Sequence, residues 1–242
     1  MDKRLDGFHL KCIAIVAMLI NHIGNGFKLY EYSDQLFFFT EFIGKLTFPI
    51  MAYLLVEGFH YTRNVKKYAA RLGFFWLVSI YPFHALFYPD YPFSWTELVN
   101  NIFFTLLMGL ILITLYDKTK NTVVHIVLVL FFSLATVMSD WNLIGVLIIF
   151  GFYRIQNVKL KKIIPPIYAT LFLFLLMLIV YFISPDSVPL YVLLSGFGIL
   201  GTIPLLLNYN GKRGYSPNWV KWGFYLFYPV HMIVLILLRS ML

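Results

Sequence analysis

The chain has 242 residues, of which 60% are hydrophobic and 12% are charged, and its mean hydropathy is +0.79. Soluble domains are close to half apolar and a quarter charged, so this composition excludes a soluble globular protein and indicates an integral membrane protein. The net charge of +8 does not indicate nucleic-acid binding, because the charges fall in short stretches between apolar segments. We expect residues 1–242 to form a single all-α domain, a polytopic transmembrane helix bundle of about nine spans.

Nine apolar segments follow one another along the chain, and each is expected to form a membrane-spanning helix. In order, they are Phe8–Phe27, Leu36–Phe59, Leu72–Tyr88, Leu98–Tyr116, Val123–Met138, Leu143–Tyr153, Ile163–Ile183, Val188–Leu207 and Trp222–Leu238. The fifth and sixth segments are short. They form either a tight hairpin whose helices extend into the flanking loops, or a pair of which one member is re-entrant. Pro49, Pro82 and Pro229 fall inside spans and predict kinks.

The charges between the apolar segments alternate in sign. Basic residues occupy the N-terminus and the even-numbered connections: Lys3, Arg4; Arg63, Lys66, Lys67, Arg71; Lys118, Lys120; Arg154, Lys159, Lys161, Lys162; Lys212, Arg213, Lys221. Acidic residues occupy the odd-numbered connections: Glu31, Asp34; Asp90, Glu97; Asp140; Asp186. Lys28 is the minor exception. The positive-inside rule therefore predicts a cytoplasmic N-terminus and, with nine spans, an external C-terminus.

The first apolar segment carries a lysine and a histidine on one face. Lys11 and His22 are eleven residues apart, which in a helix is three turns plus roughly 20°, with an axial separation of about 16 Å. Ionisable side chains at such depth face a cavity or a partner rather than lipid. The sequence therefore predicts that both residues line one polar path through the protein.

Two polar clusters follow from the predicted depths. The outer cluster contains His22, Lys45, Asn101 and Asp140, with His231 near the middle of the last span; the inner cluster contains Lys11, Glu57, His60, Arg63, Lys67 and Arg71. Structural roles are also open for these residues. A histidine within a span often hydrogen-bonds another helix, Lys11 can snorkel to the headgroups, and the cations at 63–71 can serve as topology signals. No serine nucleophile elbow, HExxH or CxxC motif occurs.

Short motifs over the whole chain resemble those of one bacterial protein family. They are Leu5–Phe8, Ile20–Gly24, Gly44–Ile50, Leu55–Asn64 with Lys67 and Tyr68, Asn101–Leu107, Asp140 ahead of Gly145–Ile149, Asn208–Gly214 and Phe227–His231. Together they resemble the TraX family, polytopic proteins named for the F-pilin N-acetylase. Two positions depart from its pattern: Asn21 stands where members usually have Asp, and Ile80-Tyr81 precedes Pro82 where members often have an acidic residue. The Lys11-to-His22 spacing also resembles the Arg-x10-His signature of the wider acyltransferase-3 proteins.

The resemblance implies a membrane acetyltransferase of the bacterial cell membrane. It would move an acetyl group from cytosolic acetyl-CoA to an acceptor at the outer face, either a pilin-like N-terminal amine or a surface-glycan hydroxyl or amine. His22, Asp140 and His231 would be catalytic; Lys45, Asn101 and Lys11 would position the substrate or polarise the thioester carbonyl; Glu57, Arg63, Lys67 and Arg71 would hold the acetyl-CoA phosphates. No metal is expected.

The chemistry of His22 has two forms that the sequence leaves open. An imidazole, with an ordinary pKa of about 6.5, suits proton abstraction from an attacking amine or hydroxyl. It can also carry the acetyl group as an acetyl-histidine intermediate. In either form, we expect the nearest carboxylate, Asp140, to orient an imidazole.

Two other classes of function use similar residues. A proton-coupled transporter or lipid flippase also places ionisable groups inside the membrane, but the chain shows no internal repeat and its charges are asymmetric between the two faces. A non-enzymatic assembly factor of a secretion or conjugation system is the remaining alternative.

Overall fold

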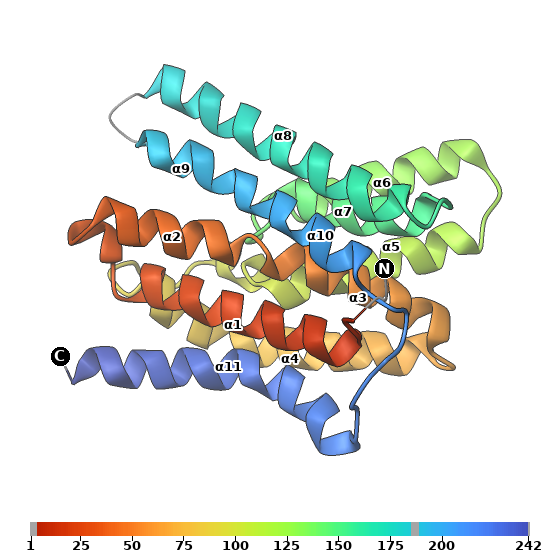
Figure 1. Cartoon of the computed structure of the whole chain (residues 1–242), viewed down its shortest axis with the longest axis horizontal. Coiled ribbons are helices and arrows are strands. Elements are labelled where there is room, and N and C mark those ends of the chain that lie inside the picture. Colours follow the sequence, from red (N-terminus) through yellow and green to blue (C-terminus); the bar gives the residue numbers. More distant parts are fainter. Residues whose placement is uncertain (1–3, 185–188, 242) are drawn as a thin grey trace.

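The computed structural model describes residues 4–184 and 189–241, and regular structure in these ranges is helical apart from an isolated parallel bridge between Leu5 and Tyr209 (Figure 1). The α-helices are α1 Gly7–Gly26, α2 Asp34–Gly44, α3 Thr47–Tyr61, α4 Val65–Phe87, α5 Ile102–Asp117, α6 Thr122–Ala135, α7 Asn142–Arg154, α8 Leu160–Ile183, α9 Leu190–Ser195, α10 Thr202–Leu207 and α11 Asn218–Ser240. Short 3-10 turns are η1 Leu29–Glu31, η2 Trp95–Val99 and η4 Gly196–Gly201.

The lengths of these helices confirm a multi-pass membrane protein. Within the described residues, five helical segments are long and apolar enough to cross a membrane: α1, the pair α2–α3 taken together, α4, α8 and α11. Four shorter apolar segments accompany them, namely α5, α6, α7 and Tyr191–Leu207. Within the described residues, the nine predicted segments all correspond to helical structure, and the all-α prediction is confirmed. Val188, the first residue of the eighth predicted segment, lies outside the described residues.

The second predicted span, Leu36–Phe59, falls within one candidate span, which consists of two consecutive helices. It breaks at Lys45 and Leu46, so that α2 ends at Gly44 and α3 begins at Thr47. Pro49 is the third residue of α3. A proline has no backbone N–H, and its ring clashes with the carbonyl of the residue four positions before it, which is Lys45. The break therefore lies where Pro49 was predicted to interrupt the helix. Pro82 and Pro229, by contrast, lie inside α4 and α11, where the kinks stay a prediction.

The short fifth and sixth segments form an antiparallel hairpin. Helices α6 and α7 have 14 and 13 residues and pack against each other. At 1.5 Å per residue they are about 21 Å and 20 Å long, less than the roughly 30 Å of a hydrocarbon core. The turn between them is held by a hydrogen bond from the Asp140 N–H to the Asn100 carbonyl (3.1 Å). This hydrogen bond places Asp140 next to the residues that precede α5.

Helix α1 contacts several other helices of the bundle. It packs against α2, α3 and α11, while α11 also packs against α4 (Figure 1). Asp6 caps its N-terminus, because Oδ1 accepts hydrogen bonds from the backbone N–H groups of Phe8 and His9. The first and last helices of the chain are therefore neighbours, although they are far apart in sequence.

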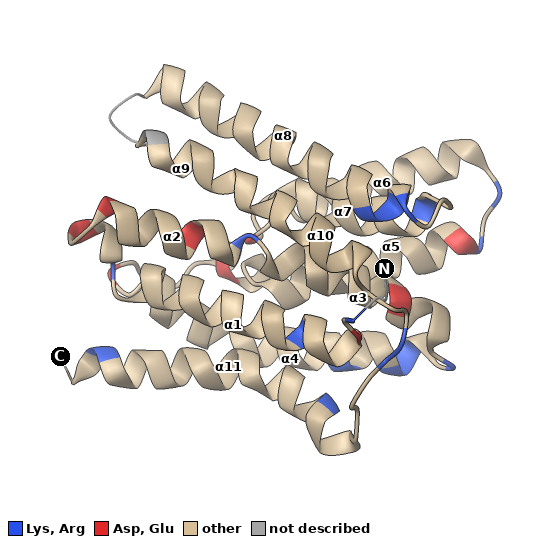
Figure 2. Ribbon diagram, in the orientation of Figure 1, with Lys and Arg blue, Asp and Glu red and all other residues tan. Residues whose placement is uncertain are grey.

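The two ends of the bundle differ in charge. Lys and Arg gather at the end formed by the connections after α3, α5, α7 and α10, called the basic end below (Figure 2). The opposite end, called the acidic end, is formed by the connections after α1, α4 and α6, which carry Glu31, Asp90, Glu97 and Asp140 together with Lys28. This agrees with the alternation of charges in the sequence, while the side of the membrane on which each end lies stays a prediction.

Cysteine labelling tests that orientation. In a Cys12→Ser background, a cysteine replacing the exposed Tyr91 at the acidic end should react with a membrane-impermeant maleimide in intact cells. A cysteine replacing the exposed Lys120 at the basic end should react only after permeabilisation. The opposite pattern would reverse the predicted orientation.

Candidate functional site

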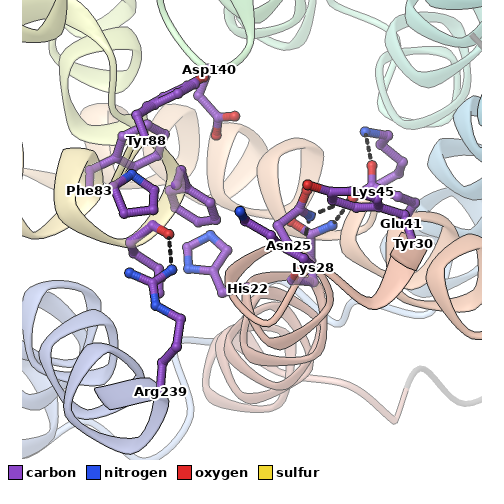
Figure 3. A pocket seen from close by; sticks show the side chains of 14 residues that line it. His22, Asn25, Lys28, Tyr30, Glu41, Lys45, Phe83, Tyr88, Asp140 and Arg239 are labelled. Carbon is purple, nitrogen blue, oxygen red and sulfur yellow. Dashed lines mark hydrogen bonds and ion pairs between the residues drawn. The ribbon is translucent and has the colours of Figure 1, made fainter. Parts of the chain in front are cut away.

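A small polar cavity of about 270 Å³ opens at the acidic end of the bundle (Figure 3). It is lined by α1, by α2, by the C-terminal part of α4 with the residues that follow it, by the α6–α7 turn and by the last turn of α11. The lining residues are Asn21, His22, Asn25, Lys28, Tyr30, Glu41, Lys45, Phe83, Leu86, Phe87, Tyr88, Pro89, Asp140 and Arg239. The structure therefore brings together His22, Lys45 and Asp140 from the predicted outer cluster.

His22 is held by the second predicted histidine, His231. The distance from His22 Nδ1 to His231 Nε2 is 2.7 Å, and the two rings stack with centroids 4.8 Å apart. Both side chains are 6% exposed. Phe227 stacks on the His231 ring with centroids 4.6 Å apart, and Phe87 meets the His22 ring edge-on at 4.9 Å. The imidazole pair is thus fixed by packing as well as by a hydrogen bond.

The hydrogen bonds determine which nitrogen of His22 is free. His231 Nδ1 lies 2.7 Å from the Phe227 carbonyl, which can only accept, so Nδ1 of His231 donates. In the neutral pair, His231 Nε2 is then an acceptor and His22 Nδ1 donates to it. This leaves the lone pair on His22 Nε2, and that atom has no hydrogen-bond partner among the described residues. His22 therefore offers a base, or a nucleophile, from the wall of the cavity.

A glutamate that the sequence did not predict as a site residue organises the α2 side of the cavity. Glu41 Oε1 accepts hydrogen bonds from Asn21 Nδ2 and Asn25 Nδ2, both at 2.6 Å, and Oε2 lies 3.1 Å from Lys45 Nζ. Glu41 and Lys45 are four residues apart, a spacing that brings such side chains together, whereas the two asparagines come from α1. Gly44 permits this close packing, since a Cβ there would lie 2.5 Å from Asn21 Cβ.

Asp140 lies in the cavity but does not orient either imidazole. Its side chain points into the cavity, toward the space between Asn25 and Tyr88 (Figure 3). It has no hydrogen bond to His22 or His231 among the described residues, and Lys45 is a charged neighbour. The imidazole that the sequence expected a carboxylate to orient is oriented by a second imidazole instead.

A larger cavity of about 730 Å³ lies toward the basic end, between α1, α3, α4, α5, α11 and the segment that precedes α11. Its charged lining residues are Lys11, Glu57, Arg63, Arg71, Arg213 and Lys221. Four of these belong to the predicted inner cluster, whereas Lys67 and His60 are exposed outside the lining. Glu57 pairs with Lys161 (Nζ to Oε1, 3.5 Å). Arg213 and Lys221 were recognised in the sequence only as basic loop residues.

The predicted common face of Lys11 and His22 is the face of α1 that meets α11. Lys11 Nζ lies 5.2 Å from the centre of the Phe224 ring, and His22 contacts His231. Lys11 lines the larger cavity and His22 the smaller one. Tyr228, 2% exposed, lies between them: its ring centre is 6.0 Å from His22 and 5.2 Å from Phe103, which lines the larger cavity. An aromatic wall therefore separates the two cavities.

Asn101, predicted to polarise the substrate carbonyl, lines neither cavity. It caps α5, because Oδ1 accepts from the Phe103 N–H (3.1 Å), and its Nδ2 donates to the Trp76 carbonyl (3.2 Å). Its side chain is fully buried. Both ends of the amide are thus engaged in holding α5 against α4.

Comparisons with known proteins identify the family. The sequence model of one family, described as "TraX protein", matches residues 6–239. The chain belongs to the TraX family. A relative from Dichelobacter nodosus, "Probable fimbrial assembly protein FimC, serogroup H1", is 29% identical over 248 residues, covering 97% of this chain and 97% of the relative. No solved structure matches the chain.

In this TraX family member, Arg239 closes the cavity at the C-terminal end of α11. Its Nη1 donates to the carbonyls of Gly26 (3.1 Å) and Leu86 (2.8 Å), and its Nη2 donates to the Ala85 carbonyl (2.8 Å). These carbonyls belong to the last turns of α1 and α4, which have no helical partner of their own. Arg239 therefore ties three helices together beside the histidine pair.

We expect Arg239→Gln to destabilise the protein by about 2 kcal/mol, because hydrogen bonds from a charged donor contribute about 1.5–3 kcal/mol. For a chain of this size that corresponds to a melting midpoint roughly 4–8 °C lower. The control is Arg154→Gln, which removes an arginine from the last turn of α7 that makes no side-chain hydrogen bond among the described residues. Equal melting midpoints of the two variants in detergent would contradict the assigned role.

Proposed function

We propose that this protein is a membrane acetyltransferase that moves an acetyl group from acetyl-CoA to an amine or hydroxyl of an acceptor at the acidic end of the bundle. The acceptor would be a pilin-like N-terminus or a surface glycan. Membership of the TraX family, named for pilin acetylation, and the fimbrial name of the Dichelobacter nodosus relative support this proposal.

The observation that carries the proposal is the histidine pair. An acyl transfer needs a group that removes a proton from the attacking atom, and His22 Nε2 bears a lone pair on a cavity wall. His231 and the Phe227 carbonyl keep that lone pair on Nε2, because the Nδ1 proton of His22 is donated to His231. This is the arrangement that holds a catalytic imidazole in one tautomer, with an imidazole in the place of the usual carboxylate.

Two routes share this geometry. In direct transfer, His22 Nε2 takes a proton from the acceptor N–H or O–H as it attacks the thioester carbonyl, and returns it to the departing thiolate. In the covalent route, His22 Nε2 itself attacks the carbonyl, the thiolate departs, and His231 Nε2 accepts the Nδ1 proton of His22. The acceptor then attacks the acetyl group, and the bond from that group to His22 Nε2 breaks while His231 returns its proton to His22 Nδ1. The proton that the acceptor N–H or O–H loses ends on the thiolate. In both routes atoms and charges balance without a metal.

Charged residues of the two cavities would position the substrates. We propose that Lys45 polarises the thioester carbonyl and that Asp140 interacts with the acceptor, since both line the small cavity with His22. Arg63, Arg71 and Lys11 would hold the donor phosphates in the larger cavity, where Glu57 also lies. The predictions for Asn101 and Lys67 have less support, because neither lines a cavity.

The thioester would have to pass the aromatic wall at Tyr228 to reach His22. Lys11 and His22 are about 16 Å apart along α1, which an extended pantetheine arm can cover. Phe103 and Tyr225 line the larger cavity on its side of the wall, and their ring centres are 6.1 Å apart. The proposal thus requires that Tyr228 move when the donor binds.

A second candidate is a non-enzymatic factor in fimbrial assembly. The printed name of the Dichelobacter nodosus relative favours it, because that name states assembly and no chemistry. A protein of this kind has no need of a histidine with a free ring nitrogen in a polar cavity, so substitution of His22 separates the two functions.

We expect His22→Ala to lower acetyl transfer by at least about 100-fold, the usual contribution of a general base, with unchanged binding of acetyl-CoA. His231→Ala should lower turnover by a similar factor if the two rings act as a unit. The measurement is transfer of labelled acetyl groups by purified protein in detergent, with a binding assay on the same samples. His125→Ala is the control, because His125 lines neither cavity. Wild-type turnover in His22→Ala would remove His22 from the mechanism.

A further inference from the structure

We propose that the segment Asn208–Tyr215 presents Arg213 as part of a phosphate clamp over the larger cavity, together with Lys221, Lys11 and Arg71. The inference rests on the proposed function, in which that cavity receives acetyl-CoA, and it adds Arg213 of the α10–α11 connection and Lys221 of α11 to the cations that would hold the phosphates. The ligand chemistry is a phosphate ester or diphosphate. The sequence contains the motif Gly211-Lys-Arg-Gly214, which lacks the spacing of a P-loop.

The connection is fixed to the N-terminus of the chain by backbone hydrogen bonds. Leu5 N–H donates to the Asn208 carbonyl (3.2 Å), Asn210 N–H to the Leu5 carbonyl (2.8 Å), and Gly7 N–H to the Lys212 carbonyl (2.8 Å). The residues that precede α1 and those that precede α11 therefore form one unit. This unit forms part of the wall of the larger cavity, in which Gly7, Gly211 and Arg213 all lie.

Two glycines set the course of the chain around Arg213. Gly211 and Gly214 have φ values of +78° and +71°, in the left-handed region that side chains with a Cβ rarely adopt. At Gly214 a Cβ would also collide with the Asp6 carboxyl group. The backbone on both sides of Lys212 and Arg213 is thus constrained, and of these two basic side chains only that of Arg213 lines the cavity.

The cavity holds more positive charge than its carboxylates balance. Lys11, Arg71, Arg213 and Lys221 have no carboxylate within ion-pair distance in the part of the chain that the structure describes. Glu57, the acidic residue in the lining, is already paired with Lys161. Arg71 Nε is buried with no hydrogen-bond partner. Like charges gathered in a cavity repel one another, and an anion with several oxygens would relieve that repulsion.

The remaining lining suits a ligand with an apolar arm. Phe224 and Tyr225 of α11 and Phe103 of α5 lie in the same cavity, and Tyr228 separates them from His22. The volume of about 730 Å³ is within the range of small-molecule sites, roughly 300–1,000 Å³. A molecule whose phosphates meet Arg213 and whose arm follows these aromatic rings would point toward the histidine pair.

The test compares Arg213→Gln with Lys212→Gln. Both variants remove one positive charge from the same exposed loop, but only Arg213 lines the cavity. The measurement is the dissociation constant of coenzyme A and of pantetheine, which has no phosphate, for the purified full chain in detergent. We expect Arg213→Gln to weaken coenzyme A binding about 10–100-fold, since a charged hydrogen bond contributes about 1.5–3 kcal/mol, and to leave pantetheine unaffected. Lys212→Gln should change neither.

The same assay separates failure of the clamp from failure of the proposed function. If the wild type binds coenzyme A and both variants bind it equally, the clamp is wrong while the proposed donor stands. If the wild type does not bind coenzyme A, the proposed donor is wrong. Arg213→Lys, which keeps the charge, should restore part of the affinity, and equal melting midpoints exclude a folding defect.

A phospholipid headgroup carries the same phosphate chemistry as coenzyme A. The binding assay is therefore repeated in nanodiscs of phosphatidylcholine alone and with added phosphatidylglycerol. We expect coenzyme A affinity to be the same in both. A loss of affinity with phosphatidylglycerol that Arg213→Gln abolishes would keep the clamp but assign it to the lipid rather than to the soluble donor.

Discussion

The hydrogen bond between His22 Nδ1 and His231 Nε2 joins the first and last helices of the chain inside the bundle. Both rings are almost fully buried, and a buried polar nitrogen without a partner costs about 1–3 kcal/mol. His22 Nδ1 and His231 Nε2 are each other's partners, and His231 Nδ1 donates to the Phe227 carbonyl, which is the last member of this hydrogen-bonded chain. Because the carbonyl can only accept, donation runs from His22 to His231 and from His231 to Phe227. The free lone pair on His22 follows from that direction.

The rest of the structure places this pair between two different environments. Toward the acidic end, the Glu41 network joins α1 to α2 and leaves Lys45 and Asp140 at the cavity wall. Toward the basic end, the wider cavity gathers cations from α1, α4, the α10–α11 connection and α11. Tyr228 lies between the two. Under the proposed function, an acyl donor on one side and an acceptor on the other would meet at His22.

Much of this arrangement could be predicted from the sequence, because it depends on periodicity. The lengths of the apolar runs predicted the nine segments. Helical spacing predicted that Lys11 and His22 share one face of the first helix, and their shared contact with α11 confirms this. Contacts between helices distant in sequence could not be predicted in the same way. The sequence alone does not indicate that Asn21 and Asn25 donate hydrogen bonds to Glu41. Nor does it indicate that the two histidines bond each other rather than Asp140, or that Arg213 lines a cavity. Each of these contacts depends on which helices are neighbours.

The most direct test of the account is the protonation pattern of the two histidines. Solid-state NMR of protein with ¹⁵N-labelled histidine, above pH 8 where an ordinary imidazole is neutral, reports which ring nitrogen bears the proton. Spectra of His22→Ala and His231→Ala assign the two signals. We predict a proton on Nδ1 of both residues, an unprotonated His22 Nε2, and a coupling across the bond from His22 Nδ1 to His231 Nε2. A proton on His22 Nε2, with none on Nδ1, would contradict the account, because the ring would then present a donor to the cavity instead of a base.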